Sequence, residues 1–232
     1  MTTSRIAILS FAALLGISAA PARASIAAAA SFDEKVDNAA AIVLAKCTKT
    51  ESRMDPSGRW IVTYSTFDVE QSMKGAPAKT ITIVTPGGSM NGIHQSSIGV
   101  PAFREGSENV LFIRNTKLGP TVLYFDQGAY DVMRDGNREP MIAPVASDVV
   151  HIDTQRGTAV PAEEPRTLND FRGAVDQSLR TASSRRQQME VLEVRKRAEK
   201  AASLTNIWSN NKLLIAAALI GLALAAWQLW RR

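Results

Sequence analysis

The sequence predicts a mainly β domain, a small closed or nearly closed barrel or alternatively a β-sandwich, followed by a helical stalk and one C-terminal transmembrane helix. Short strand-like runs recur between turn residues up to residue 155, and a charged helical pattern follows. Finally, Leu213 to Trp230 contains only Gln228 as a clearly polar side chain. Six or seven short strands at this spacing are typical of barrels and sandwiches. We favour the barrel, because closure hides edge strands without a second sheet.

The N-terminal 24 residues have the three parts of a secretory signal. Arg5 precedes an apolar run over residues 6–20, and Ala24 ends a small-residue cleavage site. The alternative is an uncleaved signal anchor. We therefore predict a signal peptide over residues 1–24 and an extracytoplasmic β-barrel domain over residues 25–155.

The strands of that domain follow from apolar runs, β-branched residues and turn signals. The predicted strands are 39–47, 60–69, 80–85, 110–113, 122–125, 129–133 and 141–145. A turn cluster over residues 55–58 predicts a hairpin between the first two strands, and Asp135-Gly136 predicts a tight hairpin between the last two. Helical periodicity is limited to residues 32–36 in this part of the chain.

Charge and cysteine content exclude some classes of protein. The whole chain has a net charge of +5, but residues 25–165 carry thirteen Lys and Arg against seventeen Asp and Glu, and residues 166–204 carry nine against five. The β domain is thus mildly acidic, which argues against a nucleic-acid partner. Cys47 is the single cysteine, so no intramolecular disulfide is possible, and its apolar strand predicts a buried, unreactive thiol.

The segment Pro86 to Ser107 is the candidate contact loop. It separates two strands by more than twenty residues, and connections of this length are often functional. Its glycines allow close backbone approach, and its polar residues offer contacts. The alternative is a covering loop whose Ile93, Ile98 and Phe103 plug one end of the barrel. The candidate contact residues are Gly87, Gly88, Gly92, His94, Pro101, Phe103, Arg104 and Glu105.

Four motifs in order carry a resemblance to a known module. They are Lys74-Gly75, the strand end over residues 85–88 reading TPGG, the loop Gly99-Val100-Pro101-Ala102-Phe103, and the strand 110–113 reading VLFI. This order resembles uncharacterised exported bacterial proteins whose fold is similar to the OB-type barrel of tissue inhibitors of metalloproteinases. The resemblance implies an OB-like binding barrel but no inhibitor chemistry, because those inhibitors need an N-terminal disulfide-tethered cysteine that this chain lacks.

Catalytic and metal-binding patterns are missing from the sequence. His94 and His151 are the two histidines, and the chain contains no HExxH, CxxC or GxSxG. His151 lies in an apolar run, near Asp148 and Asp153, and is predicted to be a strand histidine satisfied by a neighbour. Glu163 lies in a proline-rich linker and is predicted to be solvated. We therefore predict no catalytic residue, no metal and no cofactor, and expect the protein not to be an enzyme.

The remaining chain is predicted as a linker, a stalk and an anchor. Residues 156–166 form the linker, and residues 167–204 a helical stalk, amphipathic at first and then charged, that starts at a Thr167–Asp170 capping pattern. A transmembrane helix is predicted over residues 209–230, with a cytoplasmic cap at 231–232. The predicted membrane-anchor residues are Leu213, Trp227, Trp230, Arg231 and Arg232.

These elements predict a membrane-anchored, extracytoplasmic binding or interaction module of unknown ligand. It would be single-pass in the cell membrane, with the lipid bilayer and an unidentified protein as partners and no nucleic acid. One alternative is an envelope hydrolase that uses His94 or His151. Another is a surface protein whose C-terminal span is a processed sorting signal.

Overall fold

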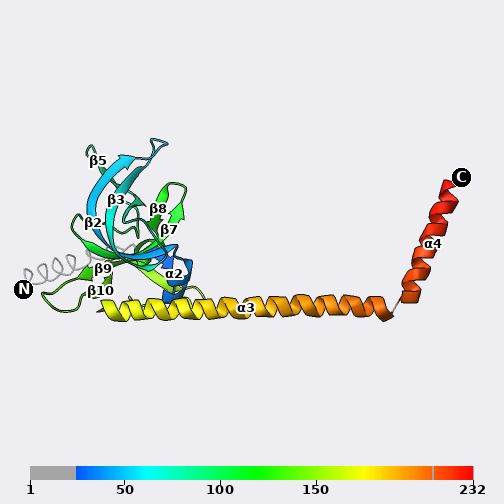
Figure 1. Ribbon diagram of the computed structural model, residues 1–232. Helices are drawn as coiled ribbons and strands as arrows, with labels where there is room; N and C mark the ends of the chain where they lie inside the picture. Colours follow the sequence, from blue (N-terminus) through cyan, green and yellow to red (C-terminus); the bar gives the residue numbers. More distant parts are fainter. Residues whose placement is uncertain (1–24, 211, 232) are drawn as a thin grey trace, which may run out of the picture. The chain divides into compact units, whose positions relative to one another are not determined.

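The computed structural model describes residues 25–210 and 212–231, and for residues 202–210 and 212–215 only the helical backbone (Figure 1). The chain divides into two compact units, one ending at Ser178 and the other beginning at Leu179. We describe each unit by itself. The first contains all the described strands and the start of a long helix.

The first unit is built mainly from antiparallel strands. An eight-stranded sheet has the order β13-β10-β9-β7-β2-β3-β4, with β8 paired to β7. A second sheet has the order β1-β11-β12, in which β1 is parallel to β11, and β5 and β6 form a separate hairpin. The strands are β1 (Ser25–Ala28), β2 (Ala41–Met54), β3 (Ile61–Lys74), β4 (Thr80–Pro86), β5 (Gly88–Met90), β6 (Ile93–Gln95), β7 (Glu108–Thr116), β8 (Gly119–Val122), β9 (Ala129–Met133), β10 (Met141–Pro144), β11 (Val149–Asp153), β12 (Thr158–Ala159) and β13 (Arg166–Thr167).

Two α-helices and one 3₁₀ helix belong to this unit in whole or in part. They are α2 (Phe32–Asn38), the 3₁₀ helix η1 (Phe125–Gly128) and the first turns of α3 (Leu168–Asn210). The side chain of Ser31 caps α2 by accepting from the backbone of Glu34 at 3.2 Å. Thr167 caps α3 in the same way, because its Oγ1 accepts from the Asp170 backbone N at 3.1 Å. The predicted helix starts near residues 32 and 167 are confirmed.

Strands β2 and β7 are apolar on both faces because each face covers a different core. Alternate residues such as Val43 and Leu111 point into the concave side of the curved sheet, where Phe67 and Phe103 pack. The residues between them, such as Phe112, point to the helices and contact Phe32 of α2 and Phe171 of α3. Figure 1 shows the long strands β2 and β3 curving above α2 and the start of α3. Continuous apolar runs are therefore buried on both faces of this sheet.

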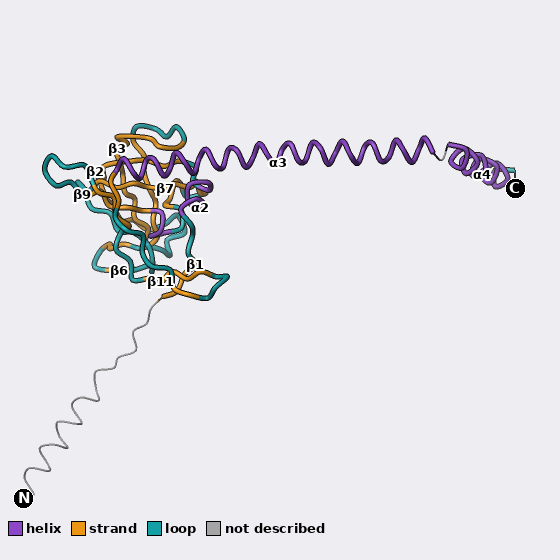
Figure 2. The backbone as a smooth tube through the Cα atoms, turned by 90° about the horizontal axis from the view of Figure 1, so that it is seen from below, coloured by secondary structure: helices purple, strands orange, loops and turns teal. Residues whose placement is uncertain are grey.

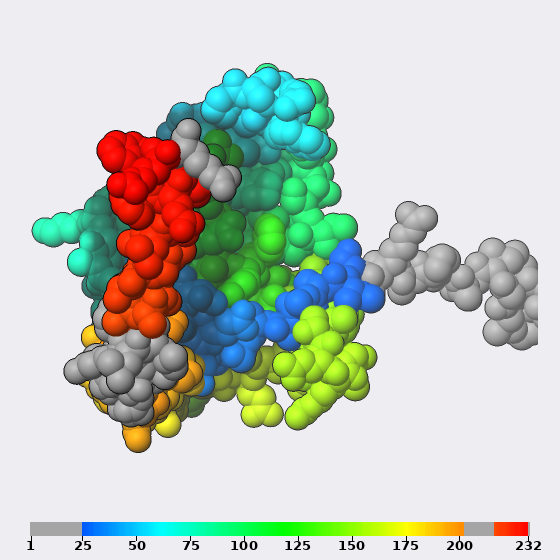
Figure 3. All heavy atoms as spheres, turned by 90° about the vertical axis from the view of Figure 1, so that its right-hand side faces the viewer, coloured from blue at the N-terminus to red at the C-terminus, as the bar shows by residue number. Residues whose placement is uncertain are grey.

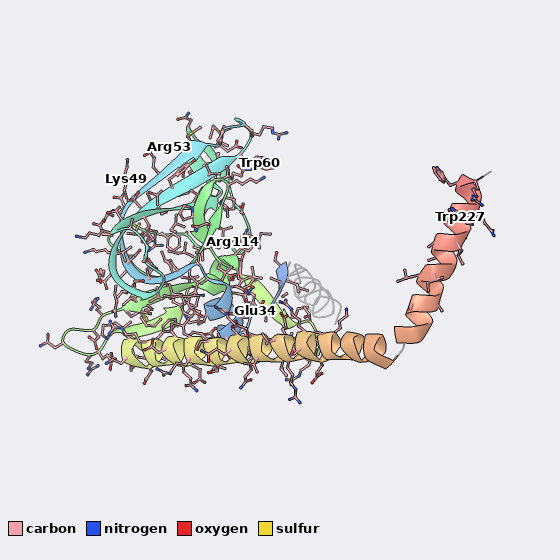
Figure 4. The ribbon with its side chains drawn as sticks, turned by 45° about the vertical axis from the view of Figure 1, so that its right-hand side comes forward. Glu34, Lys49, Arg53, Trp60, Arg114 and Trp227 are labelled. Carbon is pink, nitrogen blue, oxygen red and sulfur yellow. The ribbon has the colours of Figure 1, made fainter. Side chains whose placement is uncertain are left out.

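Both predicted hairpins are confirmed. β2 and β3 pair from Met54 and Ile61 onward, and their connection is the cyan tip at the top of the face seen in Figure 3. Along β2, Lys49 and Arg53 both bind Glu51, and the two labelled side chains project from the same strand in Figure 4. Strands β9 and β10 pair across the turn that contains Asp135 and Gly136.

The predicted closed barrel is wrong, because the sheet stays open between β4 and β8. These strands lie side by side, but no backbone ladder joins them. Their recorded link is a side-chain bond, in which Thr121 Oγ1 donates to Val84 O at 2.7 Å. β8 has four residues and contains Pro120, which lacks a backbone donor, so it is a poor closing strand. The other sheets have three and two strands, so the described residues do not form the alternative sandwich of two large sheets.

The predicted strand over residues 122–125 also needs correction. β8 ends at Val122, and Tyr124 and Phe125 have positive φ angles of 56° and 58°. These angles are incompatible with a strand and lead the chain into η1. Close packing of Gly128 fixes this turn, because an added Cβ there would lie 1.9 Å from Leu123 O.

The second unit is helical. It contains residues 179–210 of α3 and the helix α4 (Lys212–Trp230). Ion pairs at i, i+4 spacing join Glu193 to Arg197 and Arg195 to Glu199, as expected for a charged helix. Among the described residues 179–201, Met189, Val191, Leu192 and Val194 are exposed.

The predicted transmembrane helix over residues 209–230 is wrong. Among the described residues, no helix is both long and apolar enough to cross a membrane. This finding conflicts with the predicted single-pass location in the cell membrane and with anchor roles for Trp227, Trp230 and Arg231, whereas the side chain of Leu213, also a predicted anchor residue, lies outside the described ones. Instead, the Arg231 guanidinium lies over the Trp227 ring, 4.2 Å from its centroid.

Of the other predicted segments, two lie at least partly outside the described residues, and the linker can be compared with the structure. The predicted signal peptide, residues 1–24, and Arg232 of the predicted anchor and cap lie outside them. The predicted linker, residues 156–166, contains β12 and the first residue of β13. It thus contributes strands to both larger sheets of the first unit.

Candidate functional site

A cavity of about 550 Å³ lies where α2, η1, β11 and the segment over residues 160–165 meet. Figure 2 shows β1 and β11 together at one side of the first unit. The volume falls in the range of small-molecule pockets. Its walls are largely apolar, and the polar side chains that line it are Lys35, Asp126, Gln127, Tyr130, Ser147, His151 and Glu163.

One end of this cavity holds a buried ionic cluster. Lys35 of α2 has 3% of its side chain exposed, and its Nζ donates to both Tyr130 Oη and Glu163 Oε1. Tyr130 Oη donates to the same Glu163 oxygen at 3.0 Å, and Arg166 donates to Glu163 Oε2 at 3.3 Å. All four side chains therefore have partners within the cluster, and the cluster ties α2 to the segment before α3.

Burial shifts the titration of two of these groups. It lowers the pKa of Lys35, while the Glu163 carboxylate acts in the opposite direction. Burial also raises the pKa of Tyr130, and the nearby Glu163 charge raises it further. Tyr130 is therefore a neutral hydrogen-bonding group at neutral pH, and each member of the cluster has at least one partner within it.

The other end of the cavity holds Asp126 of η1 and His151 of β11. Their Oδ2 and Nε2 atoms are 3.3 Å apart. Both atoms are buried, and neither makes a hydrogen bond of good geometry within the described residues. The other carboxylate oxygen of Asp126 accepts from the Gln127 backbone at 3.0 Å, so the side chain is held in place. The cavity thus contains an acceptor that the protein itself does not satisfy.

Local backbone geometry positions Asp126. Tyr124 and Phe125 are consecutive left-handed residues, a conformation that costs about 1–2 kcal/mol for each non-glycine residue. The Asp126 backbone N donates to Gly99 O at 2.9 Å. The long loop over residues 86–107 therefore binds the start of η1 through a backbone hydrogen bond. Strain of this kind clusters at functional sites.

The predicted contact loop is partly structural. Pro101 and Phe103 are buried, and the Phe103 ring packs edge-on against Phe67 with centroids 5.0 Å apart. Glu105 accepts from the Thr50 backbone at 3.0 Å, while Arg104 is exposed. The alternative of a covering loop holds for Phe103, but it fails for Ile93 and Ile98, which are 63% and 64% exposed.

The remaining predicted loop residues gather at the β5–β6 hairpin and its base. His94 Nδ1 lies 2.8 Å from Ser89 Oγ across the hairpin, and Gly92 lies at its tip. Gly87 and Gly88 allow the base of the hairpin to lie against β2, β3 and β6. A pocket of about 360 Å³ lies beneath this part of the loop.

A third cavity, about 600 Å³, lies along the open edge between β4 and β8. Its lining includes Arg114, Leu118 and Phe125, and Figure 4 labels Arg114 on β7. Its Tyr124 hydroxyl is satisfied by Glu34 and Asn38, at 2.9 and 2.8 Å. This cavity shows no orphaned polar atom among the described residues, so it makes a weaker candidate.

The sequence analysis did not predict the 550 Å³ cavity at α2, η1 and β11, which is called the main cavity from here on. His151 is in a strand as predicted, but it is not satisfied by a neighbour as expected: its Nε2 lies 3.3 Å from Asp126 Oδ2 without a hydrogen bond of good geometry. Glu163 was predicted to be solvated, yet it binds Lys35, Tyr130 and Arg166. The signal available in the sequence was the lone His151 within an apolar strand.

In the described part of the chain, no group of three or more His, Cys, Asp and Glu side chains is placed so that it could hold a metal ion. Cys47 is buried as predicted, and its Sγ lies 3.5 Å from Thr50 Oγ1.

Comparison with known proteins gave no match to any family model, any curated protein or any solved structure. The resemblance to exported barrel proteins stays a prediction. The cavity must therefore be interpreted from its own chemistry.

Proposed function

We propose that this protein is a ligand-binding module, and that its ligand is a small molecule with an apolar body and a protonated amine. The observation that carries the proposal is the orphaned Asp126–His151 pair inside the 550 Å³ cavity. A buried carboxylate oxygen without a donor loses free energy that a bound donor restores.

The lining of the cavity supports both parts of this ligand. Three alanines, four valines and three prolines from β10, β11, the connection between them and residues 160–165 provide apolar walls; they are Ala143, Ala146, Ala162, Val145, Val149, Val150, Val160, Pro144, Pro161 and Pro165. Lys35, the cationic side chain that lines the cavity, is already paired with the Glu163 carboxylate, so it is a poorer partner for an anionic ligand than an unpaired cation. An ammonium group at Asp126 gains a charge-assisted hydrogen bond in a site shielded from water.

The test uses three probes of the same length on the full chain: n-hexylammonium, 1-hexanol and hexanoate, each titrated by calorimetry. The ammonium should bind, and hexanoate should not. Asp126→Asn keeps the shape and removes the charge, so the affinity for hexylammonium should fall about tenfold or more.

The matched control is Asp135→Asn, at an exposed carboxylate in the β9–β10 turn. It should bind hexylammonium as the natural chain does. Equal binding of hexanol and hexylammonium would overturn the cationic assignment, and equal binding by Asp126→Asn would overturn the site.

A second candidate function is hydrolysis, which the 2.8 Å contact between Ser89 Oγ and His94 Nδ1 favours. The pair lies exposed on a hairpin of three-residue strands, and no carboxylate that orients His94 is recorded within the described residues. This arrangement lacks the third group that usually orients such a base. Ester hydrolysis that disappears in Ser89→Ala would favour the enzyme over the binding module.

A further inference from the structure

The pocket beneath the 86–107 loop differs from the main cavity in chemistry and position. It is formed by β2, β3 and β4 below and by the loop above, with a volume of about 360 Å³. Eight hydroxyl side chains line it: Thr50, Ser52, Thr63, Ser65, Thr85, Ser89, Ser96 and Ser97. No Asp, Glu, Lys or Arg lines it, and His94 is the one imidazole among the described lining residues.

The hydroxyls of β2 and β3 are held in fixed positions. Ser52 Oγ and Thr63 Oγ1 lie 3.0 Å apart, and Thr63 Oγ1 donates to Gly87 O at 2.7 Å. The Ser89 backbone N donates to Ser52 Oγ at 3.3 Å. Gly88 fits above this pair because it has no side chain; an added Cβ would lie 2.4 Å from both hydroxyl oxygens. The TPGG segment thus closes the loop over a row of ordered hydroxyls.

Ser65 provides a second observation that points to a ligand. Its side chain lines the pocket, the residue is 1% exposed, and its buried Oγ has no hydrogen-bond partner in the described part of the chain. Buried hydroxyls are normally paired, and the flanking Ser52 and Thr63 already are. Ser65 Oγ is therefore an open donor and acceptor at the wall of a pocket.

The other walls are apolar. Phe103 is fixed against Phe67, and Val100 and Pro101 lie beside it in the lining. A ligand that fits must offer hydroxyls to one side and a C–H surface to the other. A charged ligand would lose its hydration without gaining a counter-ion, at a high free-energy cost.

We propose that this pocket is a binding site for a neutral carbohydrate unit. Sugar hydroxyls can donate to and accept from serine and threonine hydroxyls, and Ser65 Oγ receives the partner that the protein does not supply. The apolar face of the sugar ring lies on Phe103 and Pro101. This site is separate from the amine-binding cavity and does not depend on it.

The experiment is saturation-transfer NMR on the full chain with four probes. D-glucose and N-acetylglucosamine are neutral, and glucose 6-phosphate and glucuronate are their charged counterparts. The neutral sugars should receive saturation, and the charged ones should not. Ser65→Ala should weaken binding of the neutral sugars about two- to tenfold.

The control is Ser72→Ala on the same strand, β3, at a serine outside the pocket that bonds Lys74 O and Gly75 O. It should leave sugar binding unchanged. Absence of saturation for both neutral sugars, equal saturation of the charged sugars, or unchanged binding in Ser65→Ala would each overturn the proposal. Asp126→Asn should not change sugar binding, so failure of one site is distinguishable from failure of the other.

Discussion

Two cavities of the β domain, the 550 Å³ main cavity and the 360 Å³ pocket beneath the 86–107 loop, accommodate buried polar groups in opposite ways. At the main cavity, Lys35 and Arg166 from distant parts of the chain share the Glu163 carboxylate, and the Asp126–His151 pair makes no hydrogen bond of good geometry. Beneath the loop, neutral hydroxyls from adjacent strands form a row, and Ser65 is left open. We infer the ligand class of each cavity from its unsatisfied atom, because that atom shows which partner the protein lacks. The predictions below test this contrast, from the largest effect to the smallest.

Truncation of Phe103, the residue that packs the 86–107 loop onto the core, should have the largest effect on stability. Phe103→Ala removes a buried ring that packs on Phe67, so the free energy of unfolding should fall by about 3–5 kcal/mol. Urea denaturation of the full chain measures it. Ile98→Ala is the matched control, because that side chain is 64% exposed and should change the free energy little. Similar losses for both would mean that the exposed part of the loop also packs.

Removal of Lys35 from the ionic cluster should lower the free energy of unfolding somewhat less than Phe103→Ala does. Lys35→Met removes one cation from Glu163 and leaves Arg166 as the other, so the free energy of unfolding should fall by about 1.5–3 kcal/mol. If Lys35 and Glu163 interact, Glu163→Gln should cost less stability in the Lys35→Met background than in the natural chain. Denaturation of the natural chain, the two single variants and the double variant measures this difference. Equal costs of Glu163→Gln in both backgrounds would contradict the described pairing.

Tyr130→Phe tests the same cluster by its pH dependence. At neutral pH the substitution should cost about 1 kcal/mol, since the phenol loses its bonds to Lys35 and Glu163. The pKa of Tyr130 is raised above its ordinary 10.0, so above about pH 10 the unfolded chain releases a proton that the folded chain keeps. The natural chain then loses stability as pH rises, by up to about 1.4 kcal/mol per pH unit, and the variant lacks this loss.

The measurement for Tyr130 is the difference in unfolding free energy between the natural chain and the variant at pH 8 and pH 11. The advantage of the natural chain should shrink or reverse at the higher pH. Lys35 titrates in both proteins, so its contribution largely cancels. An advantage that grows with pH would contradict a buried, neutral phenol.

Ser65→Ala should have the smallest effect on stability. Its hydroxyl has no partner, so removing it gives up no hydrogen bond, and the free energy of unfolding should change by less than about 1 kcal/mol. Thermal and urea denaturation measure it. A loss above 2 kcal/mol would show that the hydroxyl is bonded within the folded protein and is not open to a ligand.

Much of the fold was predictable because its signals are local. Alternating residues in β4, the Asp135-Gly136 turn and the Thr167 cap each depend on neighbours within a few positions. The edge between β4 and β8 was not predictable in this way. Whether two strands pair across the sheet depends on the length of β8 and on Pro120 within it, which the strand count ignores.

The main cavity was unpredictable because its polar pairs are distant in the sequence. Lys35 and Glu163 are 128 residues apart, and Asp126 meets His151 through the fold rather than through a motif. The pocket beneath the 86–107 loop was partly predictable, since the loop glycines were expected to allow close backbone approach and Gly87 and Gly88 do lie close against neighbouring strands. What they approach, the Ser52–Thr63 pair, depends on the register of β2 and β3.

The most direct test of this account is a crossed titration of n-hexylammonium and D-glucose into the natural chain, Asp126→Asn and Ser65→Ala. We predict that Asp126→Asn weakens binding of the ammonium about tenfold and leaves glucose unchanged, and that Ser65→Ala does the reverse with a two- to tenfold effect. Either substitution changing both ligands, or neither ligand, would contradict two independent sites of opposite chemistry.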